Sequence, residues 1–139
     1  MSVLENLTVG AQAAHRRGHW TLDTIFGLFP KLEELRSRQG GFLSGGEQQM
    51  LTIARTLMGN PELLLLDEPS EGLAPLVVES LLNQVAELKR QGLTILLAEQ
   101  GVEVSLALGG HVYVLEPGAV HQTGPAEWQR RIANIPILQ

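Results

Sequence analysis

The sequence predicts an α/β fold in which crossover helices connect the strands of a parallel sheet. Short apolar runs at 63–66, 93–98 and 111–115 alternate with helix-like segments, and this alternation is typical of βαβ units. Apolar residues make up 44% of the chain and aromatic residues only 4%, an aliphatic balance that favours helices packed on a buried sheet. At 139 residues we expect one compact unit, or one piece of a larger one.

The first part of the chain is predicted to be helical. Residues 2–9 and about 21–36 have helical patterns, the second interrupted by Gly27 and Pro30, with a solvated polar loop at 15–19 between them. A stronger helix is expected to begin after Ser44 and to end before the Gly-Asn-Pro sequence at 59–61. Its apolar residues recur at intervals of three and four: Met50, Ile53, Ala54, Leu57 and Met58.

The second part of the chain is predicted to alternate strands and helices. The four leucines at 63–66 lie between the Gly-Asn-Pro sequence at 59–61 and the Asp-Glu-Pro sequence at 67–69. So short an apolar run suits a strand buried on both faces better than a helix. Residues 75–91 form the clearest helix, with Pro75 in the first turn and Gly92 after the end. We then expect a buried strand at 93–98, a helix near 102–108, a strand at 111–115, a turn into a short strand ending near His121, and a terminal helix near 125–132.

Charge and composition argue against several classes of protein. The formal net charge is −5 and the basic residues are scattered, whereas a nucleic-acid-binding protein normally has a basic face, so we expect no nucleic-acid partner. No cysteine is present, which excludes disulfides and thiol chemistry. No apolar run approaches the roughly 20 residues that span a bilayer, and the first residues lack the features of a signal peptide. We therefore expect a cytoplasmic protein.

The first motif of chemical interest lies at 43–50. Ser44 and Glu47 have the spacing of a capping box, in which each side chain accepts a hydrogen bond from the other residue's backbone N–H. Gly45 and Gly46 are harder to explain, because glycine costs up to about 1 kcal/mol relative to alanine inside a helix. Glycines at a helix start do allow backbone N–H groups to approach an anion closely. The motif is therefore a candidate phosphate site, although many ordinary helices also begin with a capping box.

The second motif is the acidic pair Asp67-Glu68 after the four leucines. In an open parallel sheet, ligands bind beyond the carboxyl ends of the strands. A carboxylate at such an end can hold Mg²⁺, and its neighbour can orient an attacking water. The alternative is that the two carboxylates are solvated loop residues that merely end a strand.

Together the two motifs are more specific than either is alone. The segment from Leu43 to Pro69 resembles the signature-to-Walker B region of ABC ATPases, and the resemblance extends over the length of the chain. It is strongest to the ATP-binding subunits of branched-chain (hydrophobic) amino-acid importers, through the sequences at 71–75, 98–100 and 113–116. The resemblance implies a partial P-loop NTPase fold over 1–139. About 1–58 would belong to the helical signature subdomain, and about 59–139 to the part of the core that runs from the Walker B motif to the C-terminus.

The resemblance also implies a role for each motif residue. The helix start would contact ATP held by an opposite subunit, through Ser44, Gly45, Gly46 and Glu47. Asp67 would help to hold Mg²⁺, Glu68 would be the general base for the attacking water, and the loop 70–74 would be the D-loop at a dimer interface. Gln100 lies where most members have a switch histidine, and its amide would reach the γ-phosphate. Two departures from the family pattern are Glu47 in place of the final signature glutamine and Ala74 in place of the D-loop aspartate.

The sequence contains no P-loop, which needs Gly-x-x-x-x-Gly-Lys-Ser/Thr. Its two lysines, Lys31 and Lys89, follow Pro30 and Leu88 instead of glycine. The aromatic loop that stacks on adenine and the Q-loop also have no counterpart. Because phosphoryl transfer depends on holding the phosphates, we expect these 139 residues alone not to hydrolyse ATP. We also expect apolar faces of the strands at 63–66 and 93–98 to be exposed, with instability or self-association as the result.

The sequence thus indicates part of an ATP-binding subunit of an importer for branched-chain or other hydrophobic amino acids. ATP and Mg²⁺ would bind together with the missing half or a partner. The expected partners are a like or unlike second ABC ATPase subunit and membrane-spanning permease subunits, at the inner face of the cell membrane. The alternatives are an inactive module that docks on a complete ATPase or permease, and an importer of urea or amides. A DNA-repair or chromosome-associated ATPase is disfavoured by the acidic charge.

Overall fold

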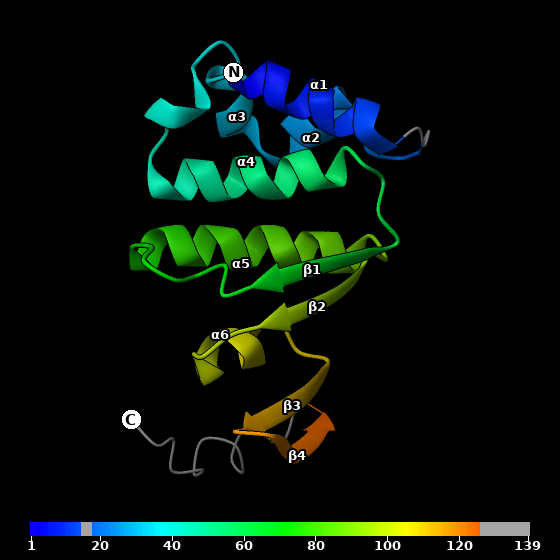
Figure 1. Ribbon diagram of the computed structural model, residues 1–139, viewed down its shortest axis with the longest axis vertical. Helices are drawn as coiled ribbons and strands as arrows, with labels where there is room; N and C mark the ends of the chain where they lie inside the picture. The colour runs from blue at the N-terminus through cyan, green and yellow to red at the C-terminus, as the bar shows by residue number, and fades with distance from the viewer. Residues whose placement is uncertain (15–17, 126–139) are drawn as a thin grey trace.

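The computed structural model describes residues 1–14 and 18–125 (Figure 1). The helices are α1 (Val3–Ala14), α2 (Leu22–Leu28), α3 (Pro30–Glu34), α4 (Gly45–Leu57), α5 (Pro75–Arg90) and α6 (Val102–Ala107), with a short 3₁₀ helix at Gly40–Phe42. The strands are β1 (Leu63–Asp67), β2 (Thr94–Ala98), β3 (His111–Glu116) and β4 (Ala119–Pro125). The helices and strands predicted from the sequence are therefore present within these ranges. The terminal helix predicted near 125–132 and residues 15–17 of the polar loop lie outside the described residues.

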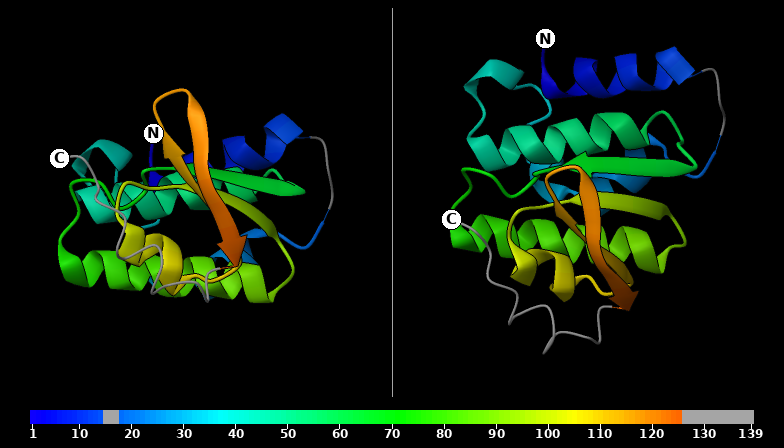
Figure 2. Two further views of the ribbon diagram at one scale, coloured as in Figure 1. Left: turned by 90° about the horizontal axis from the view of Figure 1, so that it is seen from below. Right: turned by 60° about the horizontal axis from the view of Figure 1, so that its bottom comes forward.

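The molecule has a helical part at one end and a small sheet in the middle. Helices α1–α4 lie together at the N-terminal end, α5 runs behind β1 and β2, and the β3–β4 hairpin lies at the other end (Figures 1 and 2). Helices α1 and α4 approach closely at Gly10, where a Cβ atom would lie 2.5 Å from the carbonyl oxygen of Arg55. A side chain at this position would therefore push the two helices apart.

The central sheet is parallel, but it has two strands instead of the expected three. β1 pairs with β2 in register from Leu63 opposite Thr94 to Asp67 opposite Ala98, and α5 makes the crossover between them. β3 does not join this sheet. It pairs with β4 in an antiparallel hairpin, whose turn uses Gly118 at φ 82°. Closing this short turn costs less chain entropy than pairing with a distant strand, which explains the difference from the prediction.

A single cluster of buried residues joins the helical part to the sheet. It contains Val3, Leu7, Trp20, Ile25, Phe29, Leu32, Leu43, Leu51, Ile53, Ala54, Leu57, Met58, Leu64, Leu66, Leu81, Val85 and Leu88. The last three come from α5, which covers one face of the sheet. Its amphipathic pattern follows from the three- and four-residue spacing of these side chains.

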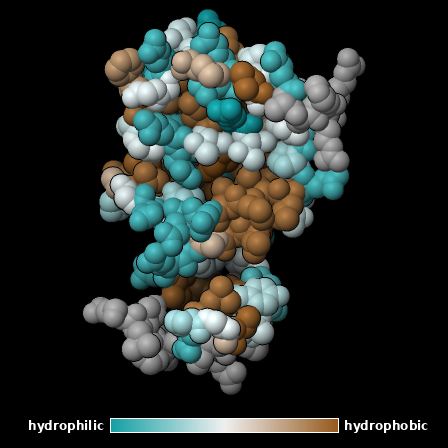
Figure 3. Space-filling model, in the orientation of Figure 1, coloured by the Kyte–Doolittle hydropathy of each residue, from teal (hydrophilic) through white to brown (hydrophobic). Residues whose placement is uncertain are grey.

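The other face of the sheet is bare. Leu64 and Leu66 point into the core, but Leu63 and Leu65 are 48% and 65% exposed, and Leu96 on β2 is 60% exposed. Figure 3 shows apolar side chains gathered over the place where β1 and β2 lie. The prediction that these strands are buried on both faces is therefore wrong for this chain. The expectation that they expose apolar faces is confirmed, because no other part of the described chain packs on this side.

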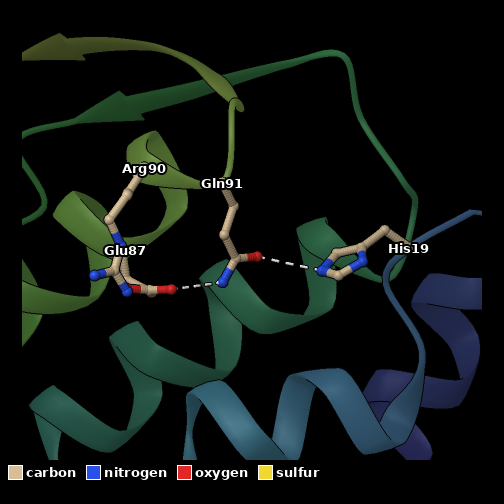
Figure 4. A network of polar contacts seen from close by, with 4 residues as sticks. All are labelled: His19, Glu87, Arg90 and Gln91. Carbon is tan, nitrogen blue, oxygen red and sulfur yellow. Dashed lines mark hydrogen bonds and ion pairs between the residues drawn. The ribbon is translucent and has the colours of Figure 1, made fainter.

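Two sets of polar contacts tie His19 and Trp20 to later parts of the chain. His19 contacts Gln91 at 3.2 Å, and Gln91 donates to Glu87 at 2.8 Å at the end of α5 (Figure 4). Arg90 also pairs with Glu87 there. The segment 18–20 is thereby held against the end of the helix that covers the sheet.

The second set is centred on Asn60, the residue that ends the turn after α4. Asn60 has φ 50°, a left-handed conformation that asparagine tolerates better than most residues. Its side chain accepts a hydrogen bond from the Trp20 N–H at 2.8 Å and donates to the Trp20 carbonyl at 3.2 Å.

Within the described part of the chain, no helix is long and apolar enough to cross a membrane.

Candidate functional site

The predicted start of α4 is confirmed in detail. Ser44 is the N-cap residue with extended backbone angles, and its hydroxyl accepts a hydrogen bond from the Glu47 N–H at 3.4 Å. The Glu47 carboxylate in turn accepts from the Ser44 N–H at 2.8 Å, which completes the capping box. The Gln48 side chain donates to the Leu43 carbonyl at 3.2 Å and secures the turn before the helix.

This capping arrangement lowers the pKa of Glu47. The hydrogen bond from the Ser44 N–H holds the pKa of the Glu47 carboxyl below its ordinary value, since that bond favours the ionised form. The same hydrogen bond shows that the Glu47 carboxylate points back towards Ser44. Its oxygen Oε2 is engaged in the cap, which makes Glu47 a residue that fixes the helix start.

The two glycines of the motif have different surroundings. Gly46 is buried, and a Cβ atom there would lie 2.4 Å from Cγ1 of Val77 in the first turn of α5. Gly45 is exposed, and a Cβ atom there would make an ordinary contact of 3.6 Å with Leu73. Close packing of α4 on α5 is thus sufficient reason for glycine at position 46, a reason that the sequence alone did not reveal. Backbone access for an anion remains an argument for Gly45.

The acidic pair lies at the carboxyl end of β1, as predicted. Asp67 is the last residue of the strand, pairs with Ala98 and is exposed. Glu68 follows with φ 44°, and its N–H donates to the Ala98 carbonyl at 2.8 Å. A left-handed conformation costs a residue other than glycine about 1–2 kcal/mol, so the surrounding contacts must hold Glu68 in place.

The structure brings the two predicted catalytic residues together. The Gln100 amide Nε2 donates a hydrogen bond to Oε1 of Glu68 at 2.7 Å, across 32 positions of the sequence. The contact exists because parallel pairing places the ends of β1 and β2 side by side, and each residue follows its strand closely. The bond orients the Glu68 carboxylate, which is half-buried.

The loop from Glu68 to α5 carries a contact that the sequence analysis missed. The Ser70 N–H donates to Oε1 of Glu99 at 3.0 Å, and the Glu71 N–H donates to the Glu68 carbonyl at 3.0 Å. Glu99 lies between the end of β2 and Gln100. The sequence does contain a signal for this contact: Glu99 is acidic, directly follows a strand and precedes the predicted site residue Gln100.

The two motifs are neighbours through packing, whereas their polar contacts remain separate. The start of α4 packs on the loop and on the first turn of α5, through Gly45 near Leu73 and Gly46 near Val77. The polar side-chain contacts of Ser44 and Glu47 are local to α4. No hydrogen bond or ion pair within the described ranges joins them to the end of β1.

The carboxylate at the end of β1 suits a magnesium ion that takes most of its ligands from water and phosphate. Among the residues that the structure describes, no group of three or more His, Cys, Asp or Glu side chains could hold a metal. The exposed carboxylate of Asp67, at the carboxyl end of a strand, could supply one oxygen ligand. Mg²⁺ usually takes one or two carboxylates and completes its coordination with waters and substrate phosphates. The residues present therefore fit Mg²⁺ bound together with a nucleotide.

Comparisons with known proteins assign the class of protein that these features define. The ABC transporter family model matches residues 1–71. The chain belongs to this family, and it carries part of the family's ATPase domain. It is 43% identical over 129 residues to the high-affinity branched-chain amino acid transport ATP-binding protein BraG of Pseudomonas aeruginosa, which covers 91% of this chain and 55% of BraG.

A second relative and a solved structure agree with this assignment. The chain is 38% identical over 99 residues to the probable branched-chain amino acid transport ATP-binding protein LivG of Methanocaldococcus jannaschii, covering 71% of this chain and 38% of that protein. The ADP conformation of an ATP-binding cassette from an ABC transporter superposes with a TM-score of 0.82 at 30% identity, over 98% of this chain and 60% of that one. The chain thus spans about half the length of BraG.

Proposed function

We propose that the chain supplies the signature helix and the catalytic carboxylate of an ATP-hydrolysing subunit in an ABC importer of branched-chain or other hydrophobic amino acids. The observation that carries this proposal is the hydrogen bond from Gln100 to Glu68 beside Asp67, at the carboxyl end of the parallel strands. A carboxylate held in one orientation at this place suits a general base that takes a proton from an attacking water. The identity to BraG and LivG supports the substrate class.

Most predicted site residues keep their roles in this proposal, whereas Gly46 and Glu47 act on ATP only through the helix start. Glu68 is the general base, and Gln100 orients it and reaches towards the γ-phosphate through its amide. Asp67 is a ligand of Mg²⁺, and the ion supplies charge neutralisation on the phosphates when it is bound. The segment 44–47 binds the phosphate of ATP: Ser44 offers its hydroxyl and Gly45 an open backbone approach, while Gly46 and Glu47 fix the helix start.

The candidate site consists of two separate segments, the signature helix and the end of β1, and this division supports a second ABC subunit as a partner. The signature helix and the end of β1 share no polar contact in the described part of the chain. This separation supports a signature segment that serves ATP bound by a second ABC subunit, like or unlike this one. We further propose permease subunits as membrane-spanning partners, with the ATPase at the inner face of the membrane. The 43% identity to BraG, which is named as a transport ATP-binding protein, supports a role in transport.

A second candidate is a module that docks on a complete ATPase or permease and does not hydrolyse ATP itself. The bare apolar face formed by Leu63, Leu65 and Leu96 favours this reading, since such faces are usually covered by a partner. The reading frame upstream of the chain distinguishes the candidates. A P-loop sequence there supports the complete ATPase, and a start signal with no P-loop supports the docking module.

The catalytic proposal is tested by joining this chain to the P-loop-containing part of BraG and measuring ATP hydrolysis. We expect turnover in the joined protein, and a loss of about 100-fold or more on Glu68→Gln, the range typical of a general base. Glu103→Gln is the matched control, because this carboxylate is exposed in the first turn of α6 and lies outside the site. Equal losses in both variants, or turnover that survives Glu68→Gln, would show that Glu68 is not the base.

A further inference from the structure

The loop that carries Glu68 is held by the end of β2 at two places. The Glu68 N–H donates to the Ala98 carbonyl at 2.8 Å, and the Ser70 N–H donates to the Glu99 carboxylate at 3.0 Å. Between these two amides lies Pro69, which has no N–H to donate. Ser70 therefore provides the first backbone donor after Glu68 that can be used to hold the loop.

We infer that Glu99 is a positioning residue: its carboxylate holds the Ser70 amide and so keeps Glu68 where Gln100 can donate to it. Two consecutive residues after β2 thereby grip two residues of the loop after β1. Glu99 accepts from Ser70 at 3.0 Å, and Gln100 donates to Glu68 at 2.7 Å. The inference deepens the proposed function and rests on it, because the orientation of Glu68 matters only if Glu68 acts as the base.

The conformation of Glu68 explains why the loop needs this second grip. At φ 44° the residue has a backbone conformation that side chains other than glycine disfavour, so it persists only where neighbouring contacts impose it. The contact of its own N–H with Ala98 fixes the entry to the loop. The contact of Ser70 with Glu99, which is partly buried, fixes the exit. Without the second contact, the peptide on the far side of Pro69 is free to turn and to carry the Glu68 side chain away from Gln100.

The geometry also separates the roles of the two glutamates. Oε1 of Glu68 accepts from a side-chain amide, whereas Oε1 of Glu99 is occupied by a backbone N–H of the loop. Burying a backbone N–H without a partner is costly, so this acceptor is needed where it is. Glu99 therefore acts on the reaction through the loop, whereas Glu68 is the carboxylate that Gln100 orients.

The inference can be tested without nucleotide on this chain joined to the P-loop-containing part of BraG, because the isolated chain exposes apolar faces of β1 and β2 and is expected to self-associate. Amide hydrogen exchange of Ser70 and the NMR signal of the Gln100 side-chain amide are measured in the unaltered fusion, Glu99→Ala, Glu99→Gln and the control Glu103→Ala. Glu103 is an exposed carboxylate in the first turn of α6. We expect Ser70 to exchange at least tenfold faster in Glu99→Ala, and the Gln100 amide signal to move towards that of a free amide. Glu99→Gln retains an acceptor oxygen and is expected to restore both readouts.

The result is decisive in either direction. Unchanged Ser70 exchange in Glu99→Ala overturns the inference, and so does a Gln100 signal that stays fixed while Ser70 is released. If Glu99→Ala does not fold, Glu99→Asp is measured instead, and its shorter side chain is expected to speed Ser70 exchange at least threefold. None of these readouts depends on ATP turnover. Failure of the BraG fusion to hydrolyse ATP would therefore count against the proposed function, and failure of these measurements against the role of Glu99.

Discussion

Replacing Gly46 by alanine tests the packing of the signature helix on α5. A Cβ atom at this position would lie 2.4 Å from Cγ1 of Val77, a separation that real side chains essentially never show. Val77 lies in the first turn of α5 and is half-buried, so it has limited room to move. The two helices must therefore separate or tilt to admit the methyl group.

The size of the effect follows from two opposing contributions. Forcing an extra methyl group into a packed interface typically costs about 1–3 kcal/mol. Alanine recovers up to about 1 kcal/mol over glycine inside a helix, and less at the helix start where Gly46 lies. We expect Gly46→Ala to lower the free energy of unfolding by about 1–2 kcal/mol. For a chain of 139 residues that corresponds to a fall in melting temperature of roughly 3–7 °C.

The assay is urea unfolding of the purified chain at low concentration, followed by circular dichroism. Gly45→Ala is the matched control, since its Cβ atom would make only an ordinary contact of 3.6 Å with Leu73. We expect that variant to be neutral or slightly more stable. In the double variant Gly46→Ala/Val77→Ala the clash is relieved, so its loss should be smaller than the sum of the two single losses. An unchanged stability of Gly46→Ala, or strictly additive losses, would refute the packing argument.

Three further predictions concern the sheet face, the turn after α4 and the capping box. Leu65→Lys should reduce self-association at little cost in stability, because Leu65 is 65% exposed on the bare face; analytical ultracentrifugation measures this. Asn60→Ala should lower the free energy of unfolding by about 1–3 kcal/mol in urea unfolding, since it releases two partly buried backbone groups of Trp20. The hydrogen bond to Glu47 lowers its folded-state pKa, so its stabilising contribution exists above the unfolded value of 4.5 and disappears as pH falls through the lowered pKa. Glu47→Gln should remove this acid-range dependence, which urea unfolding at a series of pH values measures.

Each of these predictions has its own control. Leu76→Lys changes an 81% exposed leucine outside the bare face, so an equal effect of both lysines would contradict the role of that face. Asn60→Gly keeps the left-handed turn and loses the side-chain contacts, so it should cost less than Asn60→Ala; the reverse order would refute the backbone argument. If the stability of Glu47→Gln falls with pH as steeply as that of the unaltered chain, the capping carboxylate does not explain the dependence.

The parts of the site that could be predicted from the sequence are those set by local rules. Ser44 and Glu47 are three residues apart, and a capping box depends on that spacing alone. Asp67 and Glu68 were found because an apolar run and the next polar residues mark the carboxyl end of a strand. Gln100 was singled out by the resemblance to ABC ATPases alone, and its bond to Glu68 needed the structure.

What the sequence could not predict depends on contacts between distant segments. A Cβ atom at Gly46 would lie only 2.4 Å from Val77 because of the way α4 packs on α5, and nothing in the sequence near position 46 reveals Val77 as its neighbour. The hydrogen bond from the Ser70 N–H to the Glu99 carboxylate joins residues that are 29 positions apart. It also depends on the shape of the loop, in which Glu68 has φ 44°. The turn from β3 into a second strand was expected, but the separation of this hairpin from the parallel sheet was not, because a strand-like pattern does not say which strand it pairs with.

The central claim is that Glu68 and Gln100 form the catalytic end of an ABC ATPase whose nucleotide-binding P-loop is not within these 139 residues. The most direct measurement is ATP turnover by the purified chain, compared with its Glu68→Gln variant. The account predicts background turnover for both, and turnover sensitive to Glu68→Gln only after the P-loop-containing part of BraG is joined. Turnover by the chain alone that Glu68→Gln abolishes would contradict it.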